Sequence, residues 1–334
     1  MDNRNYKSLH AKIINKKKYT QFINESKLIK CRKLYLIEKL NQKYSFFPKS
    51  NTLFSSFIIN AKKEDNLLQL FRLQLLLKHF ISSRLLESLN KTYLNNINKF
   101  NDKDIFDFLL NKFNNNNRNY KKPICPKWDY ILDNIILQYK HLTKKYKNNK
   151  IKYLDIGCGD LKKTLKMKKF LNLSKEDVYG TDIKSWGPYK NNKYNLDIQF
   201  EYILNNKLQY EDNSFDLITC IYTLHHIEKL EMFLKEINRV LKKNGYLILI
   251  EHDINSDYDR IAVTIEHILY SCLYEKRKNY IQKRDYMLLF NRDEWNYLLN
   301  KYGFQFKYYS TVNSESGWGE LNYNNSCFMI YKKN

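Results

Sequence analysis

Five short apolar segments, separated by helical or loop stretches, restrict most strongly how this chain can fold. They are residues 153–156, 178–182, 198–202, 215–221 and 245–251. Short apolar strands that alternate with helices are typical of βαβ units, in which parallel strands form one sheet and helices cover it. Two further strands are predicted at 304–311 and 326–331. The sequence therefore predicts an α/β fold.

The segment before these strands differs in character and suggests a separate region. Residues 1–112 show helical periodicity and no alternation of strands and helices, so we expect a basic helical N-terminal region. Residues 113–126 contain a run of asparagines followed by two prolines, which favours turns and buries little apolar surface. We expect this segment to be a linker, and residues 127–334 to form the α/β domain.

The charge of the chain is positive and unevenly distributed. The formal net charge is +23 over 334 residues, and residues 1–126 contribute +16 of it. Such a surplus attracts polyanions, with nucleic acid as the leading candidate. However, only ten of the 58 basic residues are arginine, and lysine, asparagine, isoleucine and tyrosine are abundant. An AT-rich genome, of a large DNA virus or a protist, produces the same bias.

Several classes of protein are disfavoured by the composition. The first twenty residues lack an apolar core, and the apolar window 67–81 is interrupted by charges, so we expect no membrane association. The six cysteines form no C-x-x-C pair, which disfavours a zinc ribbon and a redox pair. Reduced thiols suit a cytoplasmic protein, in the host cytoplasm or the virion if the source is viral.

The sharpest motif is Tyr-Leu-Asp-Ile-Gly-Cys-Gly-Asp-Leu at 153–161. An apolar strand enters a turn with glycines at 157 and 159, and a helix follows. Glycine lets the backbone turn tightly and approach a ligand closely. The N–H groups that begin the helix can bind a carboxylate or a phosphate. The second strand then ends in Asp182, where a carboxylate can accept hydrogen bonds from both hydroxyls of a ribose.

Three more motifs follow in order. They are Glu-Asp-Asn-Ser-Phe-Asp at 211–216, Leu-His-His at 224–226 and Arg-Val-Leu-Lys-Lys-Asn-Gly at 239–245. Together with the glycine turn and Asp182, this ordered set resembles the class I S-adenosylmethionine-dependent methyltransferases, in particular the branch with a type 11 methyltransferase domain. The resemblance covers residues 127–334. It implies a Rossmann-like sheet of seven mostly parallel strands with the last strand reversed, and S-adenosylmethionine as cofactor.

The resemblance also implies roles for individual residues. Asp182 would bind the ribose, Ile183 would lie against the adenine, and Tyr222 would lie beside the methyl group. Many relatives place an aspartate about six residues before the aromatic residue that precedes the Glu-Asp-Asn-Ser-Phe-Asp motif, where it accepts from the adenine amino group. The corresponding stretch here, residues 204–210, has no carboxylate, but the side-chain oxygen of Asn205 could accept instead. The turn around the amino-acid end of the cofactor would comprise Asp155, Gly157, Cys158 and Gly159.

A hydroxyl acceptor would benefit from a general base, and histidine is the usual one near neutral pH. Residues 225, 226, 252 and 267 are the histidines of the α/β region considered for this role. His226 and His252 are preferred because ligands bind at the carboxyl ends of strands in α/β sheets. Adjacent strand residues point to opposite faces, so we expect no metal site from the run at 251–253.

Three functions fit these features. The preferred one is an S-adenosylmethionine-dependent methyltransferase that acts on RNA, for example an mRNA cap, and is guided by the basic N-terminal region. The first alternative is a small-molecule methyltransferase in which that region forms a lid or a dimer surface. The second is a non-catalytic scaffold that retains the fold. The sequence specifies neither the methylated atom nor the oligomeric state.

Overall fold

The computed structural model describes most of the C-terminal half of the chain and parts of the region before it. The described residues are 77, 83–92, 104, 107–108, 111, 150–183, 197–256, 259–260, 262–263, 266–267, 287–311 and 326–334. Contacts between Cα atoms divide the chain into Met1–Tyr44 and Ser45–Asn334, and all described residues belong to the second unit. The linker predicted at 113–126 lies outside the described residues, as does most of the predicted N-terminal region.

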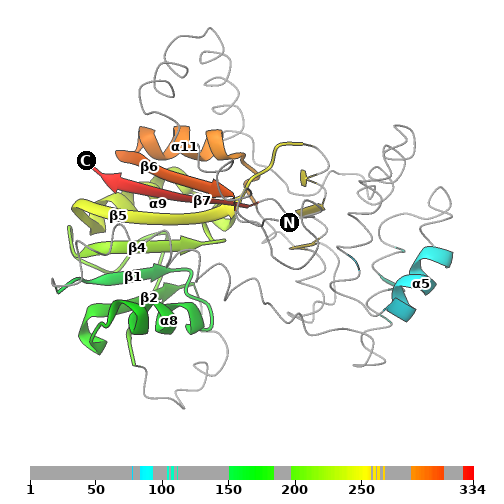
Figure 1. Ribbon diagram of the computed structural model, residues 1–334, viewed down its shortest axis with the longest axis horizontal. Coiled ribbons are helices and arrows are strands. Elements are labelled where there is room, and N and C mark those ends of the chain that lie inside the picture. Colours follow the sequence, from blue (N-terminus) through cyan, green and yellow to red (C-terminus); the bar gives the residue numbers. More distant parts are fainter. Residues whose placement is uncertain are drawn as a thin grey trace, which may run out of the picture. The chain divides into compact units, whose positions relative to one another are not determined.

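A seven-stranded sheet forms the centre of the described structure (Figure 1). Its strands lie in the order β3-β2-β1-β4-β5-β7-β6. Their bounds are β1 Tyr153–Ile156, β2 Val178–Asp182, β3 Gln199–Tyr202, β4 Phe215–Ile221, β5 Leu241–His252, β6 Phe304–Thr311 and β7 Ser326–Lys333. Every strand predicted from the sequence is present.

The strand directions confirm the predicted Rossmann-like fold. Strands β3, β2, β1, β4 and β5 pair in parallel, whereas β7 pairs antiparallel with both β5 and β6. The last strand of the chain is therefore the reversed one. Because the chain progresses outward from β1 on one side and from β4 on the other, the strand order reverses between β1 and β4. In α/β sheets, ligands bind at this point, beyond the carboxyl ends of the strands.

Helices connect the strands and cover the sheet. Helix α8 (Lys162–Leu171) joins β1 to β2, α9 (Leu230–Val240) joins β4 to β5, and α11 (Arg292–Lys301) precedes β6. Right-handed crossovers that progress in opposite directions place α8 on one face and α9 on the other. Helix α11 lies beside α9, since Lys301 and Tyr302 both bond to Glu231.

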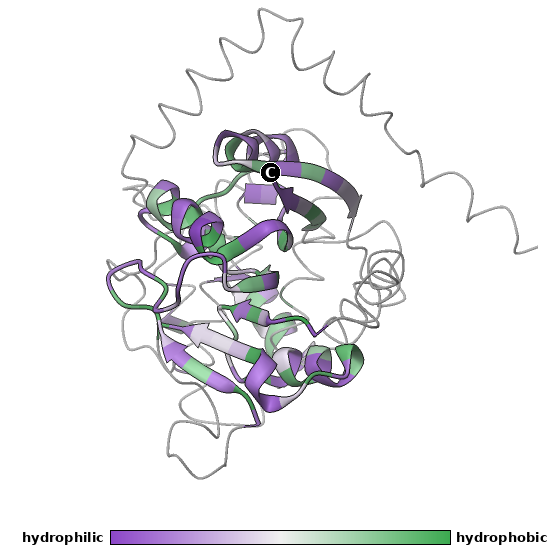
Figure 2. Cartoon of the chain, turned by 90° about the vertical axis from the view of Figure 1, so that its left-hand side faces the viewer, coloured by the Kyte–Doolittle hydropathy of each residue, from purple (hydrophilic) through white to green (hydrophobic). Residues whose placement is uncertain are grey.

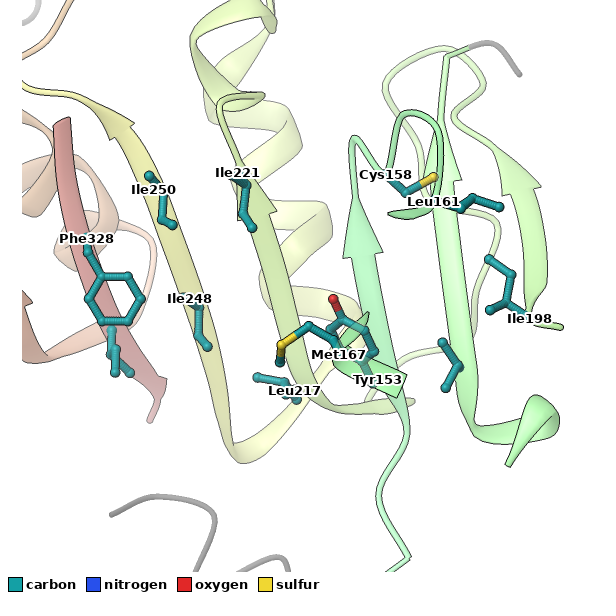
Figure 3. Packing of buried hydrophobic residues seen from close by; sticks show 12 residues of the cluster. Tyr153, Cys158, Leu161, Met167, Ile198, Leu217, Ile221, Ile248, Ile250 and Phe328 are labelled. Atoms are coloured by element: carbon teal, nitrogen blue, oxygen red, sulfur yellow. The ribbon is translucent and has the colours of Figure 1, made fainter. Parts of the chain in front are cut away.

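The core follows from the apolar pattern of these elements. Every residue of β1 is buried, and in β4 only Asp216 is not. On one face of the sheet, Tyr153, Leu217, Ile248 and Phe328 from four strands pack with Met167 of α8 (Figure 3). Figure 2 shows hydrophobic and hydrophilic residues interspersed along both the strands and the helices. Strands buried on both faces are what a parallel sheet requires.

Helix α9 shows why the Arg-Val-Leu-Lys motif occurs. Its apolar residues are buried at helical spacing, namely Leu230, Phe233, Leu234, Ile237 and Val240. Burying each contributes about 1.5–3 kcal/mol. Arg239 points away from this core and donates to the carbonyl oxygens of Leu208 and Tyr210 and to the carboxylates of Asp212 and Glu236. The arginine therefore fixes the loop before β4 to the helix.

The start of β5 differs most from the sequence prediction. The strand was expected to begin at Gly245, but α9 ends at Val240 and β5 begins at Leu241. Leu241 pairs with Phe215, and the register then shifts before Tyr246 pairs with Leu217. Asn244, at φ +66°, lies within this irregular segment. The polar Lys-Lys-Asn stretch hid the start of the strand, because it breaks the apolar pattern.

Two local features complete the fold. The capping box of α11 is closed by Asn291 and Glu294, each of which accepts a hydrogen bond from the other's backbone N–H; such caps contribute about 1 kcal/mol. Helix α5 (Ser83–Thr92) buries Leu85, Leu86 and Leu89, which agrees with the helical periodicity there. Among the described helices, none has the length and apolarity that crossing a membrane requires.

Candidate cofactor-binding site and histidine cluster

The turn after β1 contains the two glycines predicted from the sequence. Gly157 and Gly159 adopt φ +69° and +56°, a region that glycine enters without steric cost. The N–H groups of Gly157 and Cys158 both donate to the carbonyl oxygen of Thr181, at 2.8 and 3.2 Å. The glycine turn is therefore tied by its backbone to the end of β2.

The two glycines have different surroundings. A Cβ atom on Gly157 would lie 2.1 Å from Oγ1 of Thr223, which follows β4. A Cβ atom on Gly159 would meet nothing within 4 Å. Gly157 thus lets the loops after β1 and β4 touch at the point where the strand order reverses, whereas Gly159 borders open space that a ligand could enter.

Asp182 joins the glycine turn directly. Its Oδ2 accepts from the N–H of Gly159 at 3.0 Å, and its Oδ1 accepts from the N–H of Ile183 at 2.7 Å. A carboxylate has about four acceptor positions, so both oxygens retain capacity for further donors. We call Gly157–Gly159, Asp182 and Ile183 the cofactor corner. Its residues fit the ribose end of S-adenosylmethionine, because an acceptor lies beside an open glycine.

Apolar side chains beside the corner are unusually exposed. Ile183 is 67% exposed, Leu204 56% and Tyr202, which pairs with Asp182 across β2 and β3, 44%. Most large apolar side chains of the described residues are buried, so an exposed group of them at a strand end is typical of a ligand surface. This surface suits the flat, apolar face of an adenine, as the resemblance implies for Ile183.

Two of the residues assigned to the glycine turn, Asp155 and Cys158, have side chains that are buried in the core. Asp155 is fully buried and accepts hydrogen bonds from the hydroxyls of Thr164, at 2.6 Å, and Thr219, at 2.8 Å. Burial raises its pKa. Cys158 is also fully buried, its Sγ lies near Gly180, and burial raises the pKa of its thiol. Asp155 thus anchors α8 to β1 and β4, and Cys158 fills the core.

Asn205 lies on an exposed turn after β3. Leu204 and Lys207 exchange backbone hydrogen bonds, and Asn205 and Asn206 between them adopt φ +53° and +58°. Two successive residues with positive φ form the type I′ turn that joins closely paired segments, and asparagine is favoured in it. The turn conformation therefore accounts for an asparagine at this position without a ligand.

Tyr222 begins the loop after β4 and also has a positive φ, +49°. Its hydroxyl donates to Oγ of Ser326 at 2.7 Å, and its backbone N–H donates to the carbonyl oxygen of Ile250 at 2.8 Å. Burial raises the pKa of the phenol. The ring centroid of Tyr222 lies 5.1 Å from that of His252. These contacts fix the loop after β4 against the ends of β5 and β7.

Glu251, near the end of β5, holds the loop after β4 in place through hydrogen bonds. Its Oε1 accepts from the N–H groups of Thr223 and Leu224, at 3.0 and 2.8 Å, and its Oε2 lies 2.5 Å from Nδ1 of His225. Glu251 and His225 are both buried. Burial raises the pKa of Glu251 to about 8 and lowers that of His225 well below its ordinary value.

Four imidazoles gather at this end of the sheet. His225 and His226 belong to the short helix Leu224–His226, His252 ends β5, and His267 lies in a helical segment that follows. Of the two predicted bases, His226 is exposed and His252 is buried. The ring of His225 lies 4.0 Å from that of His226 and 4.9 Å from that of His252, centroid to centroid.

Sequence reasoning overlooked the pairing of Glu251 with His225 and of His225 with His267. The run Glu251-His252-Asp253 was noticed, but it was judged as three neighbours on one strand. The structure gives these neighbours different tasks: Glu251 bonds to His225, whereas Asp253 accepts from the N–H of Arg292 at 2.8 Å. Only the register of β4 and β5 reveals that the ends of these two strands meet.

Comparison with known proteins agrees with the geometry of the sheet. Residues 154–249, which span β1 to most of β5, match the model of a family described as methyltransferase domain. The chain is 37% identical over 70 residues to the sterol 4-C-methyltransferase strm-1 of Caenorhabditis elegans, which is 20% of this chain and 21% of that protein. It is 26% identical over 126 residues to the ubiquinone biosynthesis O-methyltransferase of Pelagibacter ubique, which is 36% of this chain and 50% of that protein.

The matched portion is limited in each case: it spans half or less of the length of these curated relatives. Among solved structures, a SAM-dependent methyltransferase from Methanosarcina mazei is similar, with 23% identity, coverage of 57% of this chain and 96% of that chain, and a TM-score of 0.41. The glycine turn and Asp182 fall within the matched segment. Residues 154–249 are therefore similar to a methyltransferase domain.

Proposed function

We propose that the chain transfers the methyl group of S-adenosylmethionine to a small-molecule acceptor. The observation that carries the proposal is the hydrogen bond from the N–H of Gly159 to Asp182, because it joins the glycine turn and the ribose acceptor into one corner. The carboxylate would accept from the ribose hydroxyls, and the exposed Ile183 would cover the adenine.

The chemistry asks little of the protein beyond positioning. The sulfonium of the bound cofactor supplies an electrophilic methyl group, and holding an acceptor in line with it accounts for much of the rate. Tyr222 and Thr223 begin the loop after β4, which touches the glycine turn at Gly157. We assign this loop to the acceptor, because it lies beside the cofactor corner at the point where the strand order reverses.

For a hydroxyl acceptor, we assign the role of general base to His226. It is exposed, whereas His252 is 5% exposed and enclosed by the rings of Tyr222 and His225. An accessible imidazole can reach a proton on the acceptor, and histidine is the side chain most often used for proton transfer near neutral pH. Replacement by glutamine should lower kcat with little change in KM for the cofactor.

The relatives change the preferred acceptor from RNA to a small molecule. Those with an activity in their names are a sterol 4-C-methyltransferase, a sterol 24-C-methyltransferase and a ubiquinone biosynthesis O-methyltransferase. Each name denotes a metabolite acceptor. A second candidate remains RNA, which the net charge of +16 in residues 1–126 favours, since basic surfaces attract phosphate backbones.

One experiment separates these functions. The full chain is incubated with S-adenosylmethionine labelled in its methyl group and, in parallel, with a metabolite extract, total RNA, capped RNA and a protein extract. We expect label in the metabolite fraction, and none with an Asp182→Ala control. Label in RNA that disappears as salt is raised would instead identify the second candidate. No label in any fraction, together with no cofactor binding by calorimetry, would leave the scaffold function.

A further inference from the structure

Three imidazoles from three separate elements converge beyond the ends of β4 and β5. We call His225, His252 and His267 the histidine cluster. One ligand atom from each lies within 4.8 Å of the others. The first two residues are buried and the third is partly buried. The ring centroids of His252 and His267 are 5.2 Å apart.

The hydrogen bonds of two rings determine where their protons lie. Nδ1 of His267 lies 2.8 Å from the carbonyl oxygen of Val263, which can only accept, so this nitrogen carries a hydrogen. Nδ1 of His225 lies 2.5 Å from Oε2 of Glu251, which only accepts when it is ionised. When Glu251 is ionised, both Nε2 atoms of the neutral rings therefore carry lone pairs.

These two lone pairs face each other across a short distance. The Nε2 atoms of His225 and His267 are 3.3 Å apart. Two acceptors at this distance repel unless a cation lies between them. Two nitrogens that bind one zinc ion tetrahedrally, at about 2.0–2.1 Å each, are separated by about 3.3 Å. The observed separation therefore matches that of two ligands of one metal ion, although a hydrogen bond between the rings has the same length.

We propose that His225, His252 and His267 bind a single divalent metal ion of the zinc type. Neutral imidazoles are the ligands that zinc accepts readily, and three protein ligands leave one position for water or another molecule. The contacts of the remaining nitrogens fit as well, because metal-binding histidines almost always donate their other N–H to a carboxylate or a backbone carbonyl. Glu251 and Val263 supply these two acceptors. The proposal does not depend on methyl transfer.

The direct test is metal content and affinity in the full chain. The protein is stripped with a chelator, titrated with Zn²⁺ alone and analysed by mass spectrometry of the metal; Co²⁺ in its place reports tetrahedral coordination through its visible absorption. We expect one ion per chain and a higher melting temperature with zinc. His252→Gln and His267→Gln should each weaken binding by about 100-fold or more. His226→Gln is the matched control and should bind one ion.

A second variant distinguishes the metal from a shared proton. If Glu251 were protonated, it could donate to Nδ1 of His225, whose Nε2–H would then donate to His267, and no metal would be needed. In Glu251→Gln the amide donates in this way and keeps both backbone hydrogen bonds through its oxygen. The metal site then predicts zinc binding weaker by about 10- to 100-fold in an intact fold. Unchanged affinity in Glu251→Gln, or no zinc bound by the unaltered chain, would overturn the proposal.

Discussion

The cofactor corner and the histidine cluster lie at the same end of one sheet but are built in opposite ways. The corner is held by backbone groups: the N–H groups of residues 157, 158, 159 and 183 supply its contacts. The cluster is held by side chains, namely the carboxylate of Glu251 and the rings that meet beside it. The corner therefore depends on where glycine is placed, and the cluster on which ionisable groups are buried together.

This contrast indicates which substitutions should reduce the stability of the domain and which should reduce its affinity for the cofactor. A hydrogen bond between backbone groups persists when the side chain of either residue is replaced, provided that the backbone conformation is kept. A buried hydrogen-bonded pair of side chains does not, because removing one partner leaves the other buried and unsatisfied. We therefore expect the largest losses of stability at the cluster and the largest losses of cofactor affinity at the corner.

The strongest prediction concerns His225→Ala. The change leaves the buried carboxyl group of Glu251 without its imidazole hydrogen-bond partner and opens a cavity, so the free energy of unfolding should fall by about 3–5 kcal/mol. Urea denaturation monitored by circular dichroism measures it. The double variant His225→Ala with Glu251→Ala removes both hydrogen-bond partners, and it should be less destabilised than the sum of the two single changes. Simple additivity would show that the pair does not interact.

The second prediction compares the two glycines. Gly157→Ala should lower the free energy of unfolding by about 3 kcal/mol, because a positive φ and a collision with Thr223 act together. Gly159→Ala has the unfavourable φ alone and should lose about 1 kcal/mol. Thermal and urea denaturation of both variants provide the comparison.

Each glycine also has its own control. Combining Gly157→Ala with Thr223→Ala removes the two nearest atoms of the collision and should restore part of the lost stability. Gly159→Ala, in contrast, should weaken S-adenosylmethionine binding in calorimetry, because its methyl group enters the open space beside Asp182. Equal destabilisation by the two single changes would contradict the assignment of Gly157 to packing and Gly159 to the ligand.

The third prediction concerns Asp182→Asn. The amide oxygen can still accept from Gly159, but the amide nitrogen cannot accept from a ribose hydroxyl. A hydrogen bond to a charged group contributes about 1.5–3 kcal/mol, so the Kd for S-adenosylmethionine should rise by about 10- to 100-fold. The control is Asp197→Asn, which alters an exposed carboxylate paired with Lys168 and should leave the Kd unchanged. Unchanged affinity in Asp182→Asn would contradict the assignment of Asp182 to the ribose.

The fold was largely predictable because its signals are local. The apolar runs and the glycine turn each lie within a few consecutive residues, and the order of βαβ units then determines the sheet. The start of β5 was not predictable, because Leu241 pairs with Phe215 through a register shift that no local pattern marks.

The candidate site shows the same difference between local signals, which were predictable, and long-range contacts, which were not. Gly157, Gly159 and Asp182 stand out because glycines and a strand-end carboxylate have local reasons to be there. The partnerships of His225 do not, since its contacts lie 26 residues away at Glu251 and 42 residues away at His267. Asp155 shows a contact that the motif did not reveal: the motif assigns it to the cofactor turn, and in the structure its side chain accepts hydrogen bonds from Thr164 and Thr219.

The smallest expected effect, at Asn205, tests whether the cofactor corner extends into the next loop. Asn205→Gly keeps the positive φ of the turn, so the free energy of unfolding should change by less than about 0.5 kcal/mol. Asn205→Ala disfavours that φ and should lose about 1 kcal/mol. If the side chain serves the turn alone, both variants keep the Kd for S-adenosylmethionine within about two-fold. A Kd that rises equally in both variants, whatever their stability, would show instead that the amide contacts the adenine and that the corner includes this loop.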